Sequence, residues 1–264
     1  LISKIIGTTF GDGGIFENLN GIFLSSSELA SIEEFENDLE NIFGNEIKKN
    51  SRIIEGGEYG HSWCYQNTNR NIIRFFQALG APIGRKSKIE LKVPEWIINN
   101  KSIQPYFFGS FFGNEVGIPK INRKGTNSLD IGMVCEEELI HNRMKFFEEI
   151  KNHLKYKKVR ATKIYINKYK DKYMVRLFIN LNFDNLMNFY KNIKIYYSKN
   201  KSKKLTETMN NLKELKFKKF NKLINTYNNL TGRNYSEEWV KNNLRLTDKS
   251  LNFILNKESL EKWN

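Results

Sequence analysis

The chain has 264 residues, with 43 Lys and Arg against 29 Asp and Glu, a formal net charge of +14 and a pI near 9.5. This positive charge is more than solubility requires and indicates a polyanionic partner, nucleic acid ahead of a membrane surface. The basic residues are interleaved with 12 Tyr and 19 Phe, which argues against a disordered basic tail. The alternative explanation of the charge is a Lys- and Asn-rich composition inherited from an AT-rich genome.

The cysteine and histidine spacings give no sign of a metal or disulfide framework. Cys64 and Cys135 have no CxxC partner, and His61, His141 and His153 lack metal-ligand spacing. No apolar run reaches the roughly 18 residues that a membrane span requires. We therefore expect a cytoplasmic, nucleoid-associated protein with reduced thiols and no membrane partner.

Two glycine-rich apolar segments stand out, residues 5–14 (IIGTTFGDGG) and residues 107–117 (FFGSFFGNEVG). Glycine in a helix costs about 1 kcal/mol relative to alanine, so something must offset that cost. Close approach of two helices would do so, because small residues let their backbones come together. Each segment would then bring one carboxylate, Asp12 or Glu115, to the same end of the pair, where a divalent cation or a shared proton relieves their repulsion.

The rest of the first half alternates between strand and helix patterns. The predicted elements are a hairpin over residues 15–25, a helix that follows Ser26, strands 48–54 and 59–66, a helix over 72–79 and a basic loop at 84–88.

The same order recurs in the second half, at a constant spacing in the chain. It predicts a strand and hairpin over residues 120–134, a helix over 136–154, strands 163–167 and 173–180, a helix over 183–193 and a basic loop at 198–201. We therefore predict an α+β fold, a pseudo-two-fold duplication of one α-β-β-α-β-β-α unit with two antiparallel sheets. The repeats would span residues 1–100 and 101–204.

Residues 205–264 are predicted to form a helical C-terminal extension. Residues 201–230 form a basic amphipathic helix pattern, and two shorter helices, 236–244 and 248–255, follow it. The short linker between these two helices is typical of a helix-turn-helix, although two short helices are also common packing units.

Strand alternation predicts which side chains meet a nucleic acid. In residues 163–167 the isoleucines share one face and the polar side chains share the other. Long polar and aromatic side chains on an antiparallel ribbon fit a DNA major groove, and a solvated sheet face is the alternative. The predicted DNA-binding residues are Lys48, Arg52, Trp63, Tyr65, Gln66, Lys88, Lys120, Arg123, Lys163, Tyr165, Asn167 and Arg176.

At the paired motifs the chain resembles the single-chain, two-motif LAGLIDADG homing endonucleases of archaeal type. Residues 5–13 (IIGTTFGDG) and 108–116 (FGSFFGNEV) fit the nine-residue pattern, the second with valine in place of the final glycine. A register that starts one residue earlier would put Asn114 on the acidic position; we prefer Glu115 because residues 12–15 and 115–118 then match as well. Residues 79–87, 93–96 and 197–201 also resemble the family, so the resemblance covers roughly residues 1–204.

The resemblance implies a monomer that cleaves both strands of a long pseudo-palindromic DNA site, with saddle-shaped sheets over the duplex and the two acids under the minor groove. It implies Mg²⁺, for which Mn²⁺ can substitute, held by Asp12, Glu115 and Gly13. Lys86 (or Lys88) and Lys199 (or Lys201) match the family's basic catalytic positions. The alternative is a non-cleaving binder of the same fold, either an intron RNA maturase or a DNA-binding regulator.

Overall fold

The computed structural model describes residues 1–57, 60–119, 121–122, 125–126, 128–232, 236–244 and 247–255. Two predicted DNA-binding residues, Lys120 and Arg123, lie outside these ranges.

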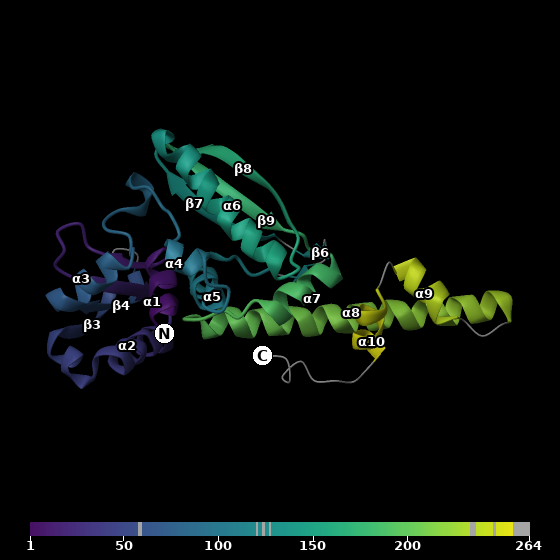
Figure 1. The fold of residues 1–264 in the computed structure, drawn as a ribbon. Coiled ribbons are helices and arrows are strands. Elements are labelled where there is room, and N and C mark those ends of the chain that lie inside the picture. Colours follow the sequence, from purple (N-terminus) through teal and green to yellow (C-terminus); the bar gives the residue numbers. More distant parts are fainter. Residues whose placement is uncertain are drawn as a thin grey trace.

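The two glycine-rich segments form helices α1 (Ile2–Thr9) and α5 (Gln104–Glu115), which pack side by side at the centre of the molecule (Figure 1). On α1 the close approach depends on glycine: a Cβ at Gly7 would overlap the Phe107 carbonyl of α5, and a Cβ at Gly11 would overlap the Asn114 side chain. The predicted helix pair is therefore present.

The glycines of α5 have a different neighbour from the one expected. A Cβ at Gly109 would meet the Lys194 carbonyl, and a Cβ at Gly113 would meet the Tyr196 carbonyl. The expectation that small residues of both helices face each other is thus wrong for α5. Its glycines admit the extended segment that connects the second half to the C-terminal helix, and Tyr196 N donates to Gly109 O at 3.2 Å.

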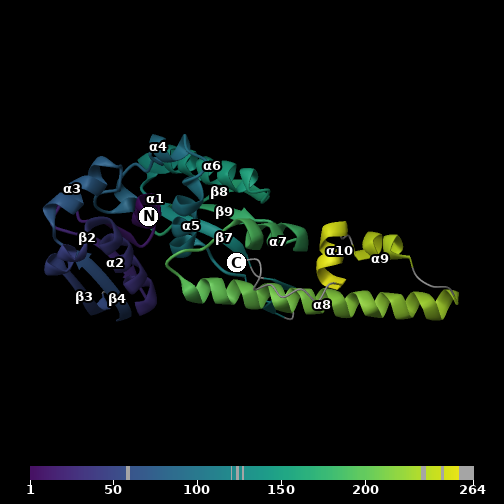
Figure 2. The same cartoon turned by 60° about the horizontal axis from the view of Figure 1, so that its bottom comes forward.

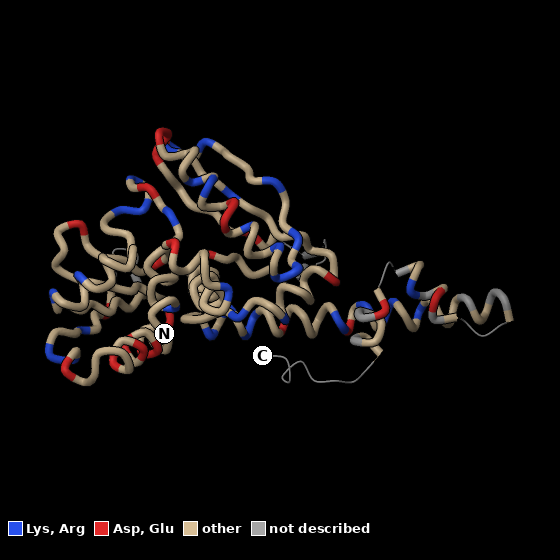
Figure 3. The backbone as a smooth tube through the Cα atoms, in the orientation of Figure 1, with Lys and Arg blue, Asp and Glu red and all other residues tan. Residues whose placement is uncertain are grey.

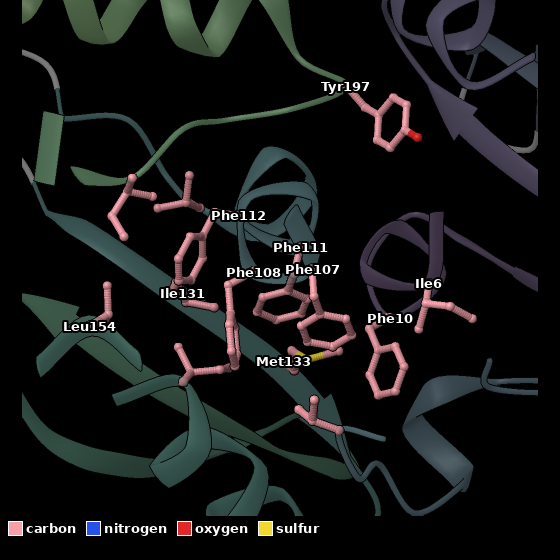
Figure 4. Close-up of a cluster of buried hydrophobic side chains, with 14 of the residues drawn as sticks. Ile6, Phe10, Phe107, Phe108, Phe111, Phe112, Ile131, Met133, Leu154 and Tyr197 are labelled. Carbon is pink, nitrogen blue, oxygen red and sulfur yellow. The ribbon is translucent and has the colours of Figure 1, made fainter. Parts of the chain in front are cut away.

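The core beside this helix pair consists largely of aromatic side chains (Figure 4). Phe107, Phe108, Phe111 and Phe112 of α5 are each at most 1% exposed. The ring centroids of Phe10 and Phe107 lie 5.2 Å apart in an edge-to-face contact, which joins α1 to this cluster.

The first half contains a four-stranded antiparallel sheet. Its strands are β1 (Gly13–Ile15), β2 (Ile22–Ser26), β3 (Ser51–Gly57) and β4 (Gly60–Asn67), in the order β1-β2-β4-β3. Helices α2 (Leu29–Phe43) and α3 (Arg70–Ala78) follow the two hairpins. Phe35 of α2 packs edge to face on Tyr65 of β4, so α2 covers one face of this sheet.

The second half contains a three-stranded antiparallel sheet in the order β7-β9-β8. Its strands are β7 (Leu129–Cys135), β8 (Ala161–Tyr169) and β9 (Lys172–Ile179). Helices α6 (Ile140–Tyr156) and α7 (Phe183–Asn192) complete this half. The predicted α+β class with two antiparallel sheets is confirmed.

Five short elements complete the two halves, and some differ from the prediction. They are the 3₁₀ turns η2 (Lys86–Lys88) and η3 (Glu137–Leu139), helix α4 (Glu95–Ile98), and the two-residue strands β5 (Ile121–Asn122) and β6 (Gly125–Thr126). β5 pairs only with β6 among the described strands, so the segment predicted as one strand and hairpin over 120–134 is divided between two sheets.

The predicted strand 48–54 begins later than expected. Lys48 lies in a 3₁₀ helix, η1 (Asn45–Asn50), and its ammonium pairs with Glu40 at 3.0 Å. Lys48 is therefore a side chain of the helical side of the first half, and its predicted place on a DNA-binding strand is wrong.

The C-terminal part consists of one long helix with two short ones packed on it (Figures 1 and 2). Helix α8 (Lys199–Thr231) runs from the central helix pair outward, and α9 (Glu237–Leu244) and α10 (Asp248–Leu255) contact it. Because α8 is continuous, the predicted boundary between residues 204 and 205 falls inside a helix. No helix of the described ranges is long and apolar enough to cross a membrane.

The closeness of α1 and α5 can be tested with Gly7→Ala. Helix propensity alone would make this substitution stabilising by about 1 kcal/mol. The overlap with the Phe107 carbonyl is with backbone, which no side-chain rotation relieves. We therefore expect a net loss of about 2 kcal/mol in the free energy of unfolding, measured by urea denaturation. A stabilised variant would contradict the observed approach.

Candidate functional site

Two carboxylates lie at the same end of the α1–α5 pair. Asp12 follows α1 in the turn that leads into β1, and Glu115 is the last residue of α5. Burial and, to a smaller extent, the charge of Asp12 raise the pKa of Glu115 to about 7. The pKa of the Asp12 carboxyl is also raised, mainly by desolvation, although its side chain reaches the surface. The site thus holds two acids close enough to repel each other.

The residue beside Glu115 has a different position. Asn114 lies against Gly11 in the helix interface, and its Nδ2 donates to Thr8 Oγ1 at 2.7 Å and to Thr8 O at 3.2 Å. Its amide is therefore used between the helices, and it is Glu115 that lies with Asp12.

Two lysines from different segments of the chain lie beside the acids. Lys86 of η2 donates from Nζ to Gly13 O at 2.6 Å, and Lys201 of α8 donates from Nζ to Asn114 O. Burial lowers the pKa of both ammonium groups, and the charges of Asp12 and Glu115 partly counter that effect. The site therefore places two cations around two carboxylates in partly buried surroundings.

Of the paired alternatives in the two basic loops, the structure brings Lys86 and Lys201 to the acids. Lys199, the first residue of α8, and Lys88 are both exposed. Lys201 follows Lys199 by two residues, which on a helix turns its side chain to another face. The sequence pattern alone left this choice open, because it did not identify the first residue of the helix.

Sequence reasoning missed Arg143, a residue of α6 that is 0% exposed. Its Nη2 donates to Lys86 O at 2.6 Å, and its guanidinium also lies within electrostatic reach of Glu115. A signal was available: Arg143 occupies the helical spacing of Leu139, Phe147 and Ile150, positions that face the core. An arginine at a core position is unusual unless it has a specific partner.

The donor atoms of this site suit a hard divalent cation. Mg²⁺ prefers oxygen ligands and commonly uses one or two carboxylates together with waters and substrate phosphates. Asp12 and Glu115 supply such carboxylates. The Gly13 carbonyl, a predicted ligand, accepts a hydrogen bond from Lys86, so that ammonium would have to move for Gly13 to bind a metal. In the described ranges no group of three His, Cys, Asp or Glu side chains could hold a metal alone.

The first sheet has an open face that carries part of the predicted DNA-binding set. Arg52 of β3 is exposed and lies opposite Gln66 of β4, which is only 8% exposed; Arg52 Nε donates to Gln66 Oε1 at 2.8 Å. Beside them is a hollow of about 870 Å³ that is lined in part by Phe16, Phe23, Gln66 and Lys86. Through Lys86 the hollow includes one of the two lysines of the acid site, but neither acid lines it.

Tyr65 and Trp63 are not on that face. Tyr65 is 0% exposed, packs on Phe35 and shares a hydrogen bond of 2.7 Å with Ser51 Oγ. Trp63, two residues earlier in β4, packs against the same core. Neighbouring strand residues point to opposite faces, so Tyr65 and Gln66 could not both face the partner. The prediction was wrong for these two aromatic residues.

The second sheet has a comparable open face. Lys163, Tyr165 and Asn167 alternate with Ile164 and Ile166 on β8, and the first three are exposed. Their positions on one face agree with the prediction.

The strand beside β8 adds a charged pair to this face. Arg176 of β9 lies opposite Tyr165, and its Nε lies 3.2 Å from the Asp130 carboxylate. Lys and Arg residues are distributed along both halves and α8 (Figure 3), while several acidic residues gather on α2.

No family model matches this chain. Among known proteins, it is 26% identical over 203 residues to the replication factor C small subunit of Methanocaldococcus jannaschii, a match that covers 73% of this chain and 11% of that protein. It is 26% identical over 168 residues to the RNA polymerase subunit Rpo1N of the same organism, covering 59% of this chain and 12% of that one. A third match is the tRNA-splicing ligase RtcB of Pyrococcus furiosus, 28% identical over 206 residues, 73% of this chain and 21% of the ligase.

Among solved structures, the chain is similar to the homing endonuclease I-DmoI in complex with DNA and Mn, with 15% identity and a TM-score of 0.46 over 73% of this chain and 97% of that one. It is likewise similar to mesophilic variants of I-DmoI, with 16% identity and a TM-score of 0.44 over 72% of this chain and 88% of that one.

The raised pKa of Glu115 predicts a pH-dependent stability. Because its folded pKa of about 7 exceeds the ordinary glutamate value of 4.5, the folded state holds the proton to higher pH than the unfolded state, and stability falls as pH rises from 4.5 to 7. Glu115→Gln should therefore gain stability relative to the parent between pH 4.5 and 7, with an upper limit of about 3 kcal/mol.

The measurement is urea unfolding of both proteins at pH 5 and at pH 7.5. Glu137→Gln, which removes an exposed acid outside the site, is the control for the loss of one negative charge. Equal pH dependence in Glu115→Gln and the parent would contradict the buried position of this carboxyl.

Proposed function

We propose that this protein is a site-specific DNA endonuclease of the LAGLIDADG homing type, which hydrolyses both strands of a long pseudo-palindromic site with Mg²⁺. The observation that carries the proposal is the acid pair at the end of α1 and α5, flanked by Lys86 and Lys201. A site with two carboxylates and two cations suits phosphodiester chemistry, because it can hold a metal and offset charge on a phosphate.

The order of the elements is compatible with a duplicated architecture. The first half runs through α1, β1, β2, α2, β3, β4 and α3, and the second through α5, the separate β5–β6 pair, β7, α6, β8, β9 and α7. Each half contributes one acid. A single chain would thus present two related sheet faces to a pseudo-palindromic duplex, so a monomer would be sufficient. The net charge of +14 agrees with a nucleic-acid partner.

In this proposal Asp12 and Glu115 would hold Mg²⁺, with Mn²⁺ as a substitute. The ion, when bound, activates water and stabilises the departing oxygen. Lys86 and Lys201 place their ammonium groups beside the acids, where they would bind the scissile phosphates and offset the charge that develops on them. The open sheet faces would hold the duplex in register by contacts with bases and phosphates.

The matched proteins also support an inserted, mobile origin. The chain matches segments of a polymerase subunit, a replication factor and a ligase, in each case over at most 21% of the matched protein. A segment shared by proteins of three different functions is what insertion into unrelated hosts would produce.

The second candidate is a non-cleaving binder of the same fold, an intron RNA maturase or a DNA-binding regulator. The observation that favours it is the C-terminal extension, in which α9 and α10 pack on the outer part of α8 as a candidate helix-turn-helix. The two candidates differ in whether the acid pair is needed for the biological activity.

Cleavage of a randomised duplex DNA library in the presence of Mg²⁺ separates the two candidates. The parent protein should enrich one cut site, and Asp12→Asn or Glu115→Gln should lower the single-turnover rate on that duplex by about 100-fold or more while binding in Ca²⁺ persists. Loss of a carboxylate removes a metal ligand without removing the sheet contacts. Binding to a defined duplex without any cleavage would favour the regulator, and a substituted protein that cuts at the parental rate would contradict the roles given to the acids.

A further inference from the structure

The segment that carries Lys86 belongs to the first half but is held by α6 of the second half. Arg143 Nη2 donates to Lys86 O at 2.6 Å and to Ile89 O at 3.4 Å. Asn142 Oδ1 accepts from Leu91 N at 2.8 Å. Two adjacent side chains of α6 thus hold residues 86–91 in place by hydrogen bonds to their backbone.

Burial of Arg143 in the core is unfavourable for the stability of the folded protein. It is completely buried, and its Nε and Nη1 form no hydrogen bond of normal geometry. The Cys135 thiol nearby is only a weak acceptor. A buried charge with unsatisfied donors is unfavourable for stability, so an apolar side chain would serve the core better. An apolar side chain would lack the hydrogen bonds to the Lys86 and Ile89 carbonyls and the charge near Glu115, and of these the bond to Lys86 O is the shortest contact.

The segment that carries Lys201 shows the converse arrangement. This segment comes at the end of the second half in sequence but is held by the first half. Glu28, at the start of α2, accepts hydrogen bonds from Ser198 Oγ at 2.7 Å and from Asn200 N at 2.9 Å. Tyr197 OH donates to Asp38 of α2 at 2.6 Å. The first turn of α8, and with it Lys201, is thus fixed by α2.

We propose that Arg143 and Glu28 are reciprocal positioning residues, each of which holds the lysine segment of the opposite half so that both ammonium groups stay at the acid pair. Lysine has a flexible stem, so its ammonium stays in place only if its backbone is fixed. Separate halves would leave both lysine segments without these backbone contacts, and each ammonium would keep only its carbonyl partner, Gly13 O or Asn114 O. The assignment of these lysines to DNA cleavage rests on the proposed function, but their anchoring does not.

The test measures how fast each lysine reacts with acetic anhydride in the intact protein without DNA, by mass spectrometry of brief labelling. Arg143→Met should raise the labelling rate of Lys86 about tenfold, the factor expected for one lost hydrogen bond to a charged group, and should leave Lys201 unchanged. Glu28→Ala should raise the labelling rate of Lys201 and leave that of Lys86 unchanged. Each variant is thus the control for the other.

Asn142→Ala provides a graded comparison, because it removes a hydrogen bond of the same segment at Leu91, five residues from Lys86, and should raise the labelling of Lys86 less than Arg143→Met does. Arg143→Lys keeps the charge with a shorter reach and should give an intermediate rate, which remains measurable if Arg143→Met does not fold. Equal labelling of Lys86 in a folded Arg143 variant and the parent would overturn the proposal. So would a parallel rise of both lysines in either variant, because that would show general loosening.

Cleavage assays on the duplex recovered from the library separate this inference from the proposed function. Arg143→Met should lower the single-turnover rate while the affinity for that duplex stays the same, and Arg143→Lys should recover part of the rate. If the parent protein cuts no DNA but the labelling pattern is as expected, the proposed function fails and the positioning roles stand. If labelling is unchanged while cleavage by the parent is strong, the positioning roles fail alone.

Discussion

The close packing of α1 on α5 is the constraint on which the rest of this structure depends. At Gly7 the backbone of one helix leaves no room for a Cβ beside the other. This contact fixes the two halves relative to each other and brings Asp12 and Glu115 to one end of the pair. On the other side of α5, Gly109 and Gly113 admit the segment that leads to Lys201. The glycine positions of the two helices therefore serve different contacts.

The charges at this end of the helix pair are balanced by groups from both halves. The two acids repel each other, and each is stabilised in its charged form by Lys86 and Lys201. Burial weakens the preference of the two acids and the two lysines for their charged states. In such partly buried surroundings a divalent ion or a phosphate would interact strongly with these groups. The charge of Arg143 adds to this field from inside the core. Neither half alone supplies the full set.

Much of the fold followed from the sequence because its signals were local. The helix pair, the two antiparallel sheets and the face that carries Lys163, Tyr165 and Asn167 could be predicted from composition and alternation. The errors involve longer range: burial of Tyr65 depends on α2 packing over its sheet, and the role of Arg143 depends on a segment from the other half. Contacts between segments that lie far apart in the sequence cannot be predicted from the spacing of residues along the chain.

The central claim is that α1 and α5 bring Asp12 and Glu115 into one site. The most direct measurement is the pKa of the Glu115 side chain, by carbon-13 NMR of protein labelled at glutamate carboxyls, in the parent and in Asp12→Asn. The account predicts a pKa of about 7 in the parent and a lower value in the variant, still above 4.5 because burial is the larger cause. The same pKa in both proteins would show that the two carboxylates do not share a site.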